Sequence, residues 1–462
     1  MTKDVGRILI VGAGPTGMGA AWRLEELGYT NFLLVEAGGH AGGLASSFVD
    51  ERGFTWDVGG HVLFSHYAYF DAAMQAALGT DGWLQHERES WVWIADRFVP
   101  YPIQNNLRYL PADMIDKAIR GLAARPPRIP SPTQDFGAWV LQTFGEGIRD
   151  IFMAPYNFKV WAYPLERLSA GWVDERVAVV DMSRVLQNIL LQQDDRSWGP
   201  NNTFKFPKYG GTGAIWRALA KQIGNERVRY GTRIRSIDHR KKIATADGGE
   251  HLAYDQILST MPLDVLATTL DPVLDPVMEA VPKLLRSHTH VVGIGLTGEM
   301  PEPLTRKCWM YFPEDNCPFY RVTVFSHYSP HNVPDPESGK YWSLLAETSE
   351  SHLKVVDRAM IVEQTIRGLL NTRLIHSRNQ VVSTWRYTAE HGYPTPSLER
   401  NDLLSKIEPA LARAGIASRG RFGAWRYEVS NQDHSFMQGV EWADALLLEV
   451  PETTFAMIRR PA

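Results

Sequence analysis

A glycine-rich turn near the N-terminus constrains this chain more than any other feature of its sequence. The apolar run Arg7–Val11 leads into Gly12-Ala13-Gly14-Pro15-Thr16-Gly17. A helix-period stretch follows, and a second apolar run, Phe32–Val35, ends on Glu36. Strand, turn, helix, strand and acid in this order are the context that the GxGxxG fingerprint requires. We therefore predict a Rossmann-like βαβ unit that binds a dinucleotide.

Each position of the turn has a physical role in that prediction. Gly12 permits the tight turn, Gly14 lets the backbone approach a pyrophosphate, and Gly17 lets the helix pack closely on the strand. Thr16 lies in the first turn of the helix, whose free N–H groups attract phosphate. Glu36 lies about 20 residues further on, where an acid binds a ribose hydroxyl.

The residues after Glu36 distinguish FAD from NAD. A second glycine cluster, with Gly43 and Leu44, follows the acid directly, and Gly59-Gly60-His61 forms a third close-approach segment. Three such segments within about sixty residues suit a long, enclosed cofactor, because glycine permits the backbone to lie close to a ligand. We therefore predict FAD rather than NAD; the alternative is that these are ordinary loop glycines.

Composition excludes several classes of protein. The chain has 462 residues, a net charge of −4 and two cysteines. The charge gives no electrostatic case for nucleic acid or an anionic membrane. No apolar run reaches the length of a bilayer span, and the first strand begins too early to leave room for a signal peptide. We expect a soluble cytoplasmic protein with reduced thiols and no metal site.

The pattern of elements predicts an α/β fold with two insertions. Segments 1–95, 208–290 and 417–462 are expected to form a discontinuous Rossmann-like FAD-binding domain. A mostly helical stretch, 96–207, is the predicted substrate domain; it contains a Pro-rich connector, residues 123–132. Short strands dominate 291–416, the predicted β-sheet domain, in which the Pro/Gly/Asp-rich loop Tyr328–Lys340 is expected to be a mobile lid edge.

Long, compositionally unusual strings give the middle and end of the chain a specific resemblance. They are GGHVLFSHY from Gly59, YPIQNN from Tyr101, PYNFKVWA from Pro155, ERVA from Glu175, WGPN from Trp198, CWMYFPEDNCPFYR from Cys308, HGYPTP from His391 and RFGAWRYEVSNQDHSF from Arg421. With them the chain resembles the UDP-galactopyranose mutases over almost its whole length, the eukaryotic type more than the bacterial type.

The resemblance implies a reaction without net redox change. In this family the reduced flavin attacks the anomeric carbon of a nucleotide-linked hexose through N5 and displaces the nucleoside diphosphate. The sugar-flavin adduct opens, recloses on a different hydroxyl and recombines with the nucleotide, so that pyranose becomes furanose. The resemblance implies UDP-galactose as substrate and NAD(P)H as the reductant.

The resemblance also assigns residues. Arg176 and Arg321 align with the diphosphate arginines, a role that suits the planar guanidinium. The residues expected to contact substrate are Tyr101, Gln104, Phe152, Asn157, Trp161, Trp309, Tyr311, Tyr393, Tyr427, Asn201 and Asn431. The residues expected at the flavin, beyond the glycines above, are His61, Arg421, Asn431, Gln432 and Ser435. The expected catalytic set is His61, Arg176, Arg321 and Asn201.

Alternatives remain open at the level of sequence. A relative acting on a GDP-linked or 6-deoxy hexose could keep every motif quoted above. An amine-oxidase-like flavin dehydrogenase shares the nucleotide domain but does not need arginines and tyrosines placed for a diphosphate. A non-catalytic flavin-binding module is disfavoured for the same reason. The short stretch after the last helix and the short 328–340 loop differ from eukaryotic mutases, so the oligomeric state is not carried over.

Overall fold

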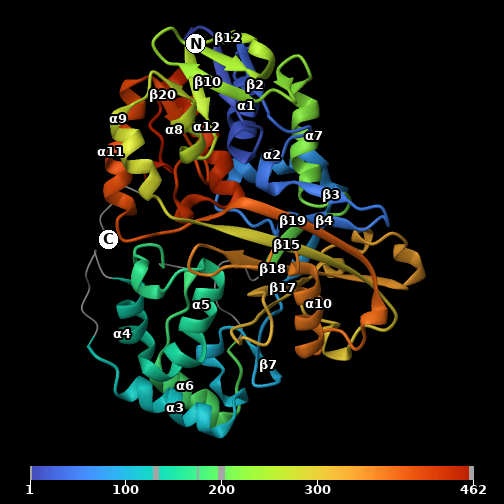
Figure 1. Cartoon of the computed structure of the whole chain (residues 1–462). Helices are drawn as coiled ribbons and strands as arrows, with labels where there is room; N and C mark the ends of the chain where they lie inside the picture. The colour runs from blue at the N-terminus through green and yellow to red at the C-terminus, as the bar shows by residue number, and fades with distance from the viewer. Residues whose placement is uncertain (1–2, 128–134, 174–175, 196–202, 457–462) are drawn as a thin grey trace.

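Two bodies, joined by long strands, make up the computed structural model, which describes residues 3–127, 135–173, 176–195 and 203–456. Figure 1 shows a nucleotide-binding body at the top and a helical layer at the bottom. The strands β15 (Arg286–Thr297) and β19 (Val381–Pro394) cross the molecule between them. The cavity described below lies where these parts meet.

A five-stranded parallel sheet forms the centre of the upper body, and the order of its strands is β20-β13-β1-β2-β9. The strands are β1 (Ile8–Val11), β2 (Phe32–Val35), β9 (Val228–Arg229), β13 (Gln256–Ser259) and β20 (Ile416–Ser418). All four residues of β1 are buried, as expected for a parallel strand that is covered on both faces. Residues far apart in sequence thus build one sheet.

Alternate residues of β1 face two different cores. Ile8 and Ile10 pack with one set of helices, and Leu9 and Val11 pack with the elements on the opposite face. The first set is α1 (Pro15–Glu26), α2 (Ala68–Leu78), α7 (Gly213–Ile223) and α12 (Gln432–Leu448). The second set is α8 (Leu263–Thr269), α9 (Asp275–Ala280), α11 (Arg400–Arg413) and a four-stranded sheet of β10 (Ile234–Asp238), β11 (Ile243–Ala246), β12 (His251–Ala253) and β14 (Leu270–Asp271). This arrangement confirms the predicted α/β fold.

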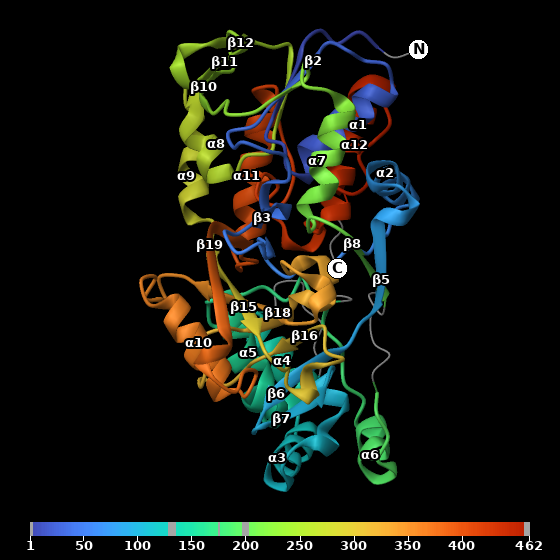
Figure 2. The same cartoon turned by 90° about the vertical axis from the view of Figure 1, so that its right-hand side faces the viewer.

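A seven-stranded sheet links the two bodies, with the order β19-β15-β18-β17-β16-β6-β7. Its remaining strands are β6 (Ser90–Ile94), β7 (Arg97–Pro100), β16 (Trp309–Tyr311), β17 (Arg321–Val324) and β18 (Tyr341–Glu350). Helix α10 (Ile361–Asn371) packs on it, as Figure 2 shows from the side. Strand β6 pairs with β16 through its backbone, so residues 90–94, within the predicted segment 1–95, are part of this second sheet.

The lower layer is helical. Its helices are α3 (Ala112–Ala123), α4 (Phe136–Ile148), α5 (Ala154–Trp161) and α6 (Met182–Leu191). Helix α3 ends at Ala123, where the Pro-rich connector begins, and residues 128–132 of that connector lie outside the described residues. Aromatic side chains of α4, of α5 and of the turn between them, including Phe136, Phe152 and Trp161, form a core with the strands β6 and β7.

Two short pairs of antiparallel strands complete the fold. The predicted loop Tyr328–Lys340 is partly buried. Strand β3 (Ser47–Val49) pairs with β4 (Thr55–Asp57), and β5 (Trp83–Glu87) pairs with β8 (Thr203–Pro207). The 328–340 segment begins with fully buried Tyr328, Ser329 and Asn332. Tyr328 packs on Phe204 and Phe206. This packing anchors the first half of the segment, whereas most residues of its second half are exposed.

Candidate active site

The glycine turn after β1 is built as the fingerprint requires. Gly12 has φ +105, and a Cβ on Gly17 would lie 1.9 Å from the Gly12 carbonyl oxygen, so α1 packs directly on the turn. The Glu36 carboxylate accepts hydrogen bonds from Ala13 N at 2.8 Å and Gly38 N at 2.7 Å, which fix it at the end of β2. The turn therefore presents backbone N–H groups and an oriented acid to one end of a cavity.

That cavity has a volume of about 1180 Å³, above the usual range for a single small-molecule site. At the nucleotide end its wall contains Gly12, Gly14, Thr16, Glu36, Gly43 and Leu44. At the far end the wall contains Tyr101, Arg176, Trp309, Tyr311, Arg321, Tyr393, Arg421 and Tyr427. Between them lie Gly59, Gly60, His61, Asn431, Gln432 and Ser435. Most of the residues predicted from sequence therefore share one continuous space.

The middle of the cavity suits a flavin. The N-termini of α1 and α12 both border it, and helix N-termini favour phosphate. His61 Nδ1 and Gln432 Oε1 are buried and make no hydrogen bond to a described residue. Buried polar atoms are normally paired, so these two are consistent with a polar ligand between them. Burial lowers the pKa of the His61 imidazole to about 4, against the opposing effect of Glu347, so His61 is neutral at pH 7.

Three guanidinium groups converge at the far end. The Arg421 guanidinium lies 4.8 Å from the Tyr393 ring centre and 5.9 Å from that of Tyr427, and the Arg176 guanidinium lies 5.0 Å from the Tyr427 ring centre. Burial raises the pKa of Tyr311 and of Tyr393 above its ordinary value. These phenols therefore stay protonated and can donate hydrogen bonds, as phosphate oxygens require.

Glu347 is a site residue that the sequence analysis missed. Its carboxylate accepts two hydrogen bonds from Arg321, Nε to Oε1 and Nη2 to Oε2, both at 2.8 Å. It also accepts one from Gly60 N at 2.9 Å and one from Tyr320 Oη at 2.8 Å. Burial raises the pKa of Glu347, but Arg321 and Gly60 outweigh burial, and the pKa lies below its usual value. The detectable signal is an acid that directly follows the apolar run Leu344-Leu345-Ala346.

Several predicted residues lie behind the cavity wall rather than in it. Gln104 Nε2 donates to Ala178 O at 2.6 Å, and Asn157 Nδ2 donates to Met153 O at 2.8 Å. The Phe152 ring stacks on Tyr156, which in turn contacts Tyr311. Trp161 packs edge-on against Tyr427 and Tyr393. These four residues support the wall, as Gly17 does at the other end, and Asn201 lies outside the described residues.

Comparison with known proteins identifies the family. The family model "Flavin containing amine oxidoreductase" matches residues 15–424. A crystal structure of reduced UDP-galactopyranose mutase is 48% identical, with a TM-score of 0.93, over 98% of this chain and 96% of that chain. The chain belongs to the UDP-galactopyranose mutase family. It also belongs to the broader family of flavin-containing amine oxidoreductases.

More distant matches show the fold alone. A fatty acid isomerase from P. acnes is 15% identical with a TM-score of 0.63, and covers 95% of this chain and 97% of that one. Putrescine oxidase bound to putrescine is 16% identical with a TM-score of 0.61, over 96% and 98% of the two chains. Neither carries an argument about substrate, because amine oxidases and isomerases share this architecture.

Membership of the mutase family confirms several expectations. The FAD-binding fold, the flavoprotein class and the isomerase class predicted from sequence are confirmed. The family implies a nucleotide sugar as the kind of substrate. Among the helices in the described part of the chain, none is both long enough and apolar enough to cross a membrane.

Proposed function

We propose that this protein interconverts the pyranose and furanose forms of a nucleoside-diphosphate hexose, UDP-galactopyranose and UDP-galactofuranose, without net redox change. The observation that carries the proposal is the far end of the cavity, where Arg176, Arg321 and Arg421 meet the phenols of Tyr311, Tyr393 and Tyr427. Such a wall matches a diphosphate, and it repels the cationic substrate of an amine oxidase.

When bound and reduced, FAD would supply a nucleophilic flavin nitrogen for covalent catalysis. The residues of this chain that would hold FAD are the glycine turn, Glu36, the Gly59–His61 segment and the N-terminal turn of α12. NAD(P)H is the proposed reductant, and the cytoplasmic setting stays a prediction from the sequence.

The chain's own groups act on the diphosphate. Arg176 donates from Nη2 to the Glu428 carbonyl, which holds the guanidinium over Tyr427. Glu347 engages Nε and Nη2 of Arg321, so that Nη1 is the nitrogen making no hydrogen bond to a described residue. Fixed cations stabilise the negative charge that grows on the leaving diphosphate, and they retain it until the sugar is ready to recombine.

The neutral His61 imidazole contributes differently. It lies beside Glu347 and Arg321, and its Nδ1 has no partner among the described residues. A neutral imidazole can accept or donate a proton within a hydrogen bond without adding charge to the cavity. We propose that it contacts the sugar or the flavin edge and does not titrate between pH 5.5 and 8.

The test is product analysis. Reduced enzyme is incubated with UDP-galactofuranose or UDP-galactopyranose under strict anaerobiosis, and the sugar isomers are separated. The proposal predicts interconversion without stoichiometric consumption of an oxidant. Conversion of GDP-linked hexoses in preference to UDP-linked ones overturns the base assignment, and peroxide formation from an amine with no isomer interconversion overturns the mutase assignment.

A further inference from the structure

Strand β19 carries a bulge of three residues where it borders the cavity. Ser287 of β15 faces Tyr393 and Thr289 faces Ala389, so the three residues Glu390–Gly392 face the single residue His288. All three bulge residues line the cavity. A Cβ on Gly392 would lie 2.2 Å from Thr289 Oγ1, which shows how closely the bulge lies against β15. Bulges commonly redirect side chains next to active sites.

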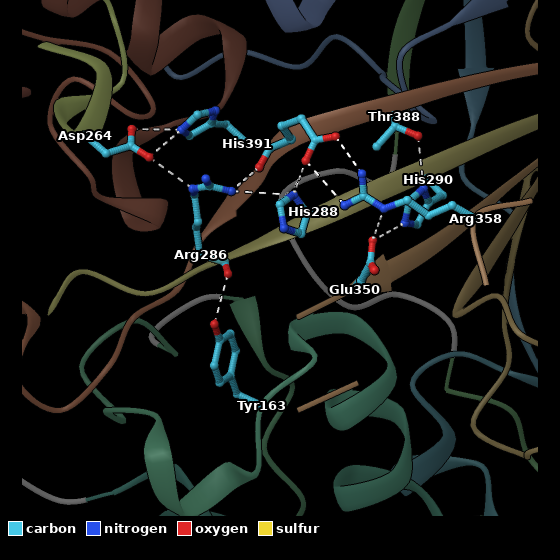
Figure 3. A network of polar contacts seen from close by, with 10 residues as sticks. Tyr163, Asp264, Arg286, His288, His290, Glu350, Arg358, Thr388 and His391 are labelled. Carbon is cyan, nitrogen blue, oxygen red and sulfur yellow. Dashed lines mark hydrogen bonds and ion pairs between the residues drawn. The ribbon is translucent and has the colours of Figure 1, made fainter. Parts of the chain in front are cut away.

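A cluster of ion pairs and hydrogen bonds joins this bulge to α8 and β15, as Figure 3 shows. Asp264 of α8 accepts from His391 Nε2, at 2.8 and 2.9 Å to its two oxygens, and from Arg286 Nε at 3.1 Å. Arg286 also donates from Nη1 to the Glu390 carbonyl at 2.5 Å. Tyr163 in turn donates to the Arg286 carbonyl at 3.0 Å. The Asp264 carboxylate, from the upper body, thus contacts both β15, through Arg286, and β19, through His391.

The other side of the bulge holds Arg421. The Gly392 carbonyl accepts from Arg421 Nε at 3.2 Å and from Nη2 at 3.1 Å, and Ser430 Oγ accepts from Nη1 at 2.9 Å. The Tyr393 ring, one residue further along β19, lies 4.8 Å from the same guanidinium. The position of Arg421 and Tyr393 is therefore determined by where the bulge places residues 392 and 393.

We propose that Asp264 is a positioning residue for the active site: through His391 and Arg286 it fixes the bulge, and the bulge fixes Arg421 and Tyr393. The inference rests on the proposed function only in taking Arg421 and Tyr393 as groups that face the ligands. Asp264 does not line the cavity among the described residues, so direct contact with a bound ligand does not explain an effect of its substitution.

The chain offers a matched control in the same network. Arg358 pairs with Glu350 from Nε and with the Glu390 carboxylate from Nη1, both at 2.8 Å. It holds the side chain of a bulge residue, but not the bulge's backbone or His391. Removing it breaks two ion pairs while leaving Asp264, His391 and Arg286 joined. Exposed ion pairs contribute little to stability, so Arg358→Ala should fold.

The experiment compares Asp264→Ala, Asp264→Asn and Arg358→Ala in FAD-loaded protein. Three quantities are measured: the midpoint potential of FAD, the dissociation constant of UDP from the reduced protein, and kcat with KM. A displaced Arg421 guanidinium stabilises anionic groups less. In Asp264→Ala the midpoint potential of FAD should therefore fall, the dissociation constant of UDP should rise about tenfold, and kcat should fall about tenfold. Asp264→Asn keeps one acceptor oxygen and should show a smaller change. Arg358→Ala should match the unsubstituted protein.

A double substitution isolates the route. Adding Asp264→Ala to Arg421→Lys should cause less additional loss than Asp264→Ala causes alone, because both changes affect the same guanidinium. Unchanged potential and UDP binding in FAD-loaded Asp264→Ala overturn the proposal, as do fully additive losses. If Asp264→Ala fails to fold, the same readouts on Asp264→Asn decide. The midpoint potential of FAD tests the positioning role of Asp264 even if the protein isomerises no sugar. A failure of this proposal is therefore distinguishable from a failure of the proposed mutase activity.

Discussion

At the scale of single residues, Glu347 joins two parts of the cavity wall, Gly60 and Arg321, through one carboxylate. Glu347→Gln removes the charge opposite Arg321, and breaking a buried pair costs about 3–5 kcal/mol. We therefore expect a clearly lower Tm and weakened FAD retention.

Because the pKa of Glu347 in the folded protein is depressed, the stabilisation that its ionised carboxylate provides is present above the ordinary carboxyl pKa. It is lost as the pH falls through the folded pKa. Thermal unfolding between pH 3 and 7 should show a flatter acid limb in the variant; parallel curves contradict this.

Arg176 and Arg321 should respond differently to truncation, although both are proposed to bind the diphosphate. Arg176→Ala removes one charge-assisted contact, worth about 1.5–3 kcal/mol, or about ten- to a hundred-fold in turnover, with Tm nearly unchanged. Arg321→Ala also leaves buried Glu347 without its cation, so Tm should fall as well. Kinetics and calorimetry on both variants check this. Equal Tm values would show that Glu347 finds another partner.

At the scale of elements, the junction of β1 and α1 depends on one missing side chain. In Gly17→Ala the new Cβ would lie 1.9 Å from the Gly12 carbonyl oxygen, a backbone atom that cannot rotate away. Helix α1 must shift, and the phosphate-binding turn shifts with it. We expect loss of most bound FAD and a Tm lower by several degrees. The control is Gly39→Ala, where nothing lies within 4 Å of the added Cβ; equal FAD content in the two variants contradicts the prediction.

Elements with a clear local pattern were predictable from sequence, and elements defined by distant partners were not. The helix at Met182 follows from apolar spacing, and β1 follows from its buried run. Only residues 381–385 of β19, Val-Val-Ser-Thr-Trp, have the β-branched and aromatic composition that predicts a strand. The rest, through Pro394, contains charged and bulged residues whose pairing partners on β15 are about a hundred residues away. For the same reason the cluster of Asp264, Arg286 and His391 had no signature in sequence.

The candidate site divides in the same way. The residues of the glycine turn were predictable because their spacing is itself the mechanism. The resemblance assigned Arg176, Arg321 and the tyrosines to one site. It did not distinguish residues that line the cavity from residues that lie behind its wall. Gln104 and Asn157 use their amides on backbone carbonyls, and a side-chain orientation of that kind depends on packing that no local pattern encodes.

At the scale of the whole molecule, ligand binding should be visible as stability. A ligand that binds only the folded state, at a concentration a hundred times its Kd, raises the free energy of unfolding by about 2.7 kcal/mol. The reduced protein should therefore show a higher Tm with UDP than with equal concentrations of GDP, ADP or dTDP. Differential scanning calorimetry under anaerobic conditions measures this. A larger shift with GDP would reassign the base, while the diphosphate contacts proposed for Arg176 and Arg321 would stand.

The sheet order β20-β13-β1-β2-β9 has a consequence for biosynthesis. Strand β1 emerges first, yet its neighbour β13 begins at Gln256, and the outer strand β20 begins only at Ile416. Helix α12, which packs against α1, is translated later still. A nascent chain must therefore hold Met18, Leu24 and the other apolar residues of α1 without their partners on α12 until nearly all of the chain has been translated. Proteolysis of ribosome-stalled chains should show protection of β1 and α1 only after α12 has emerged; earlier protection would mean that the N-terminal half completes its own core.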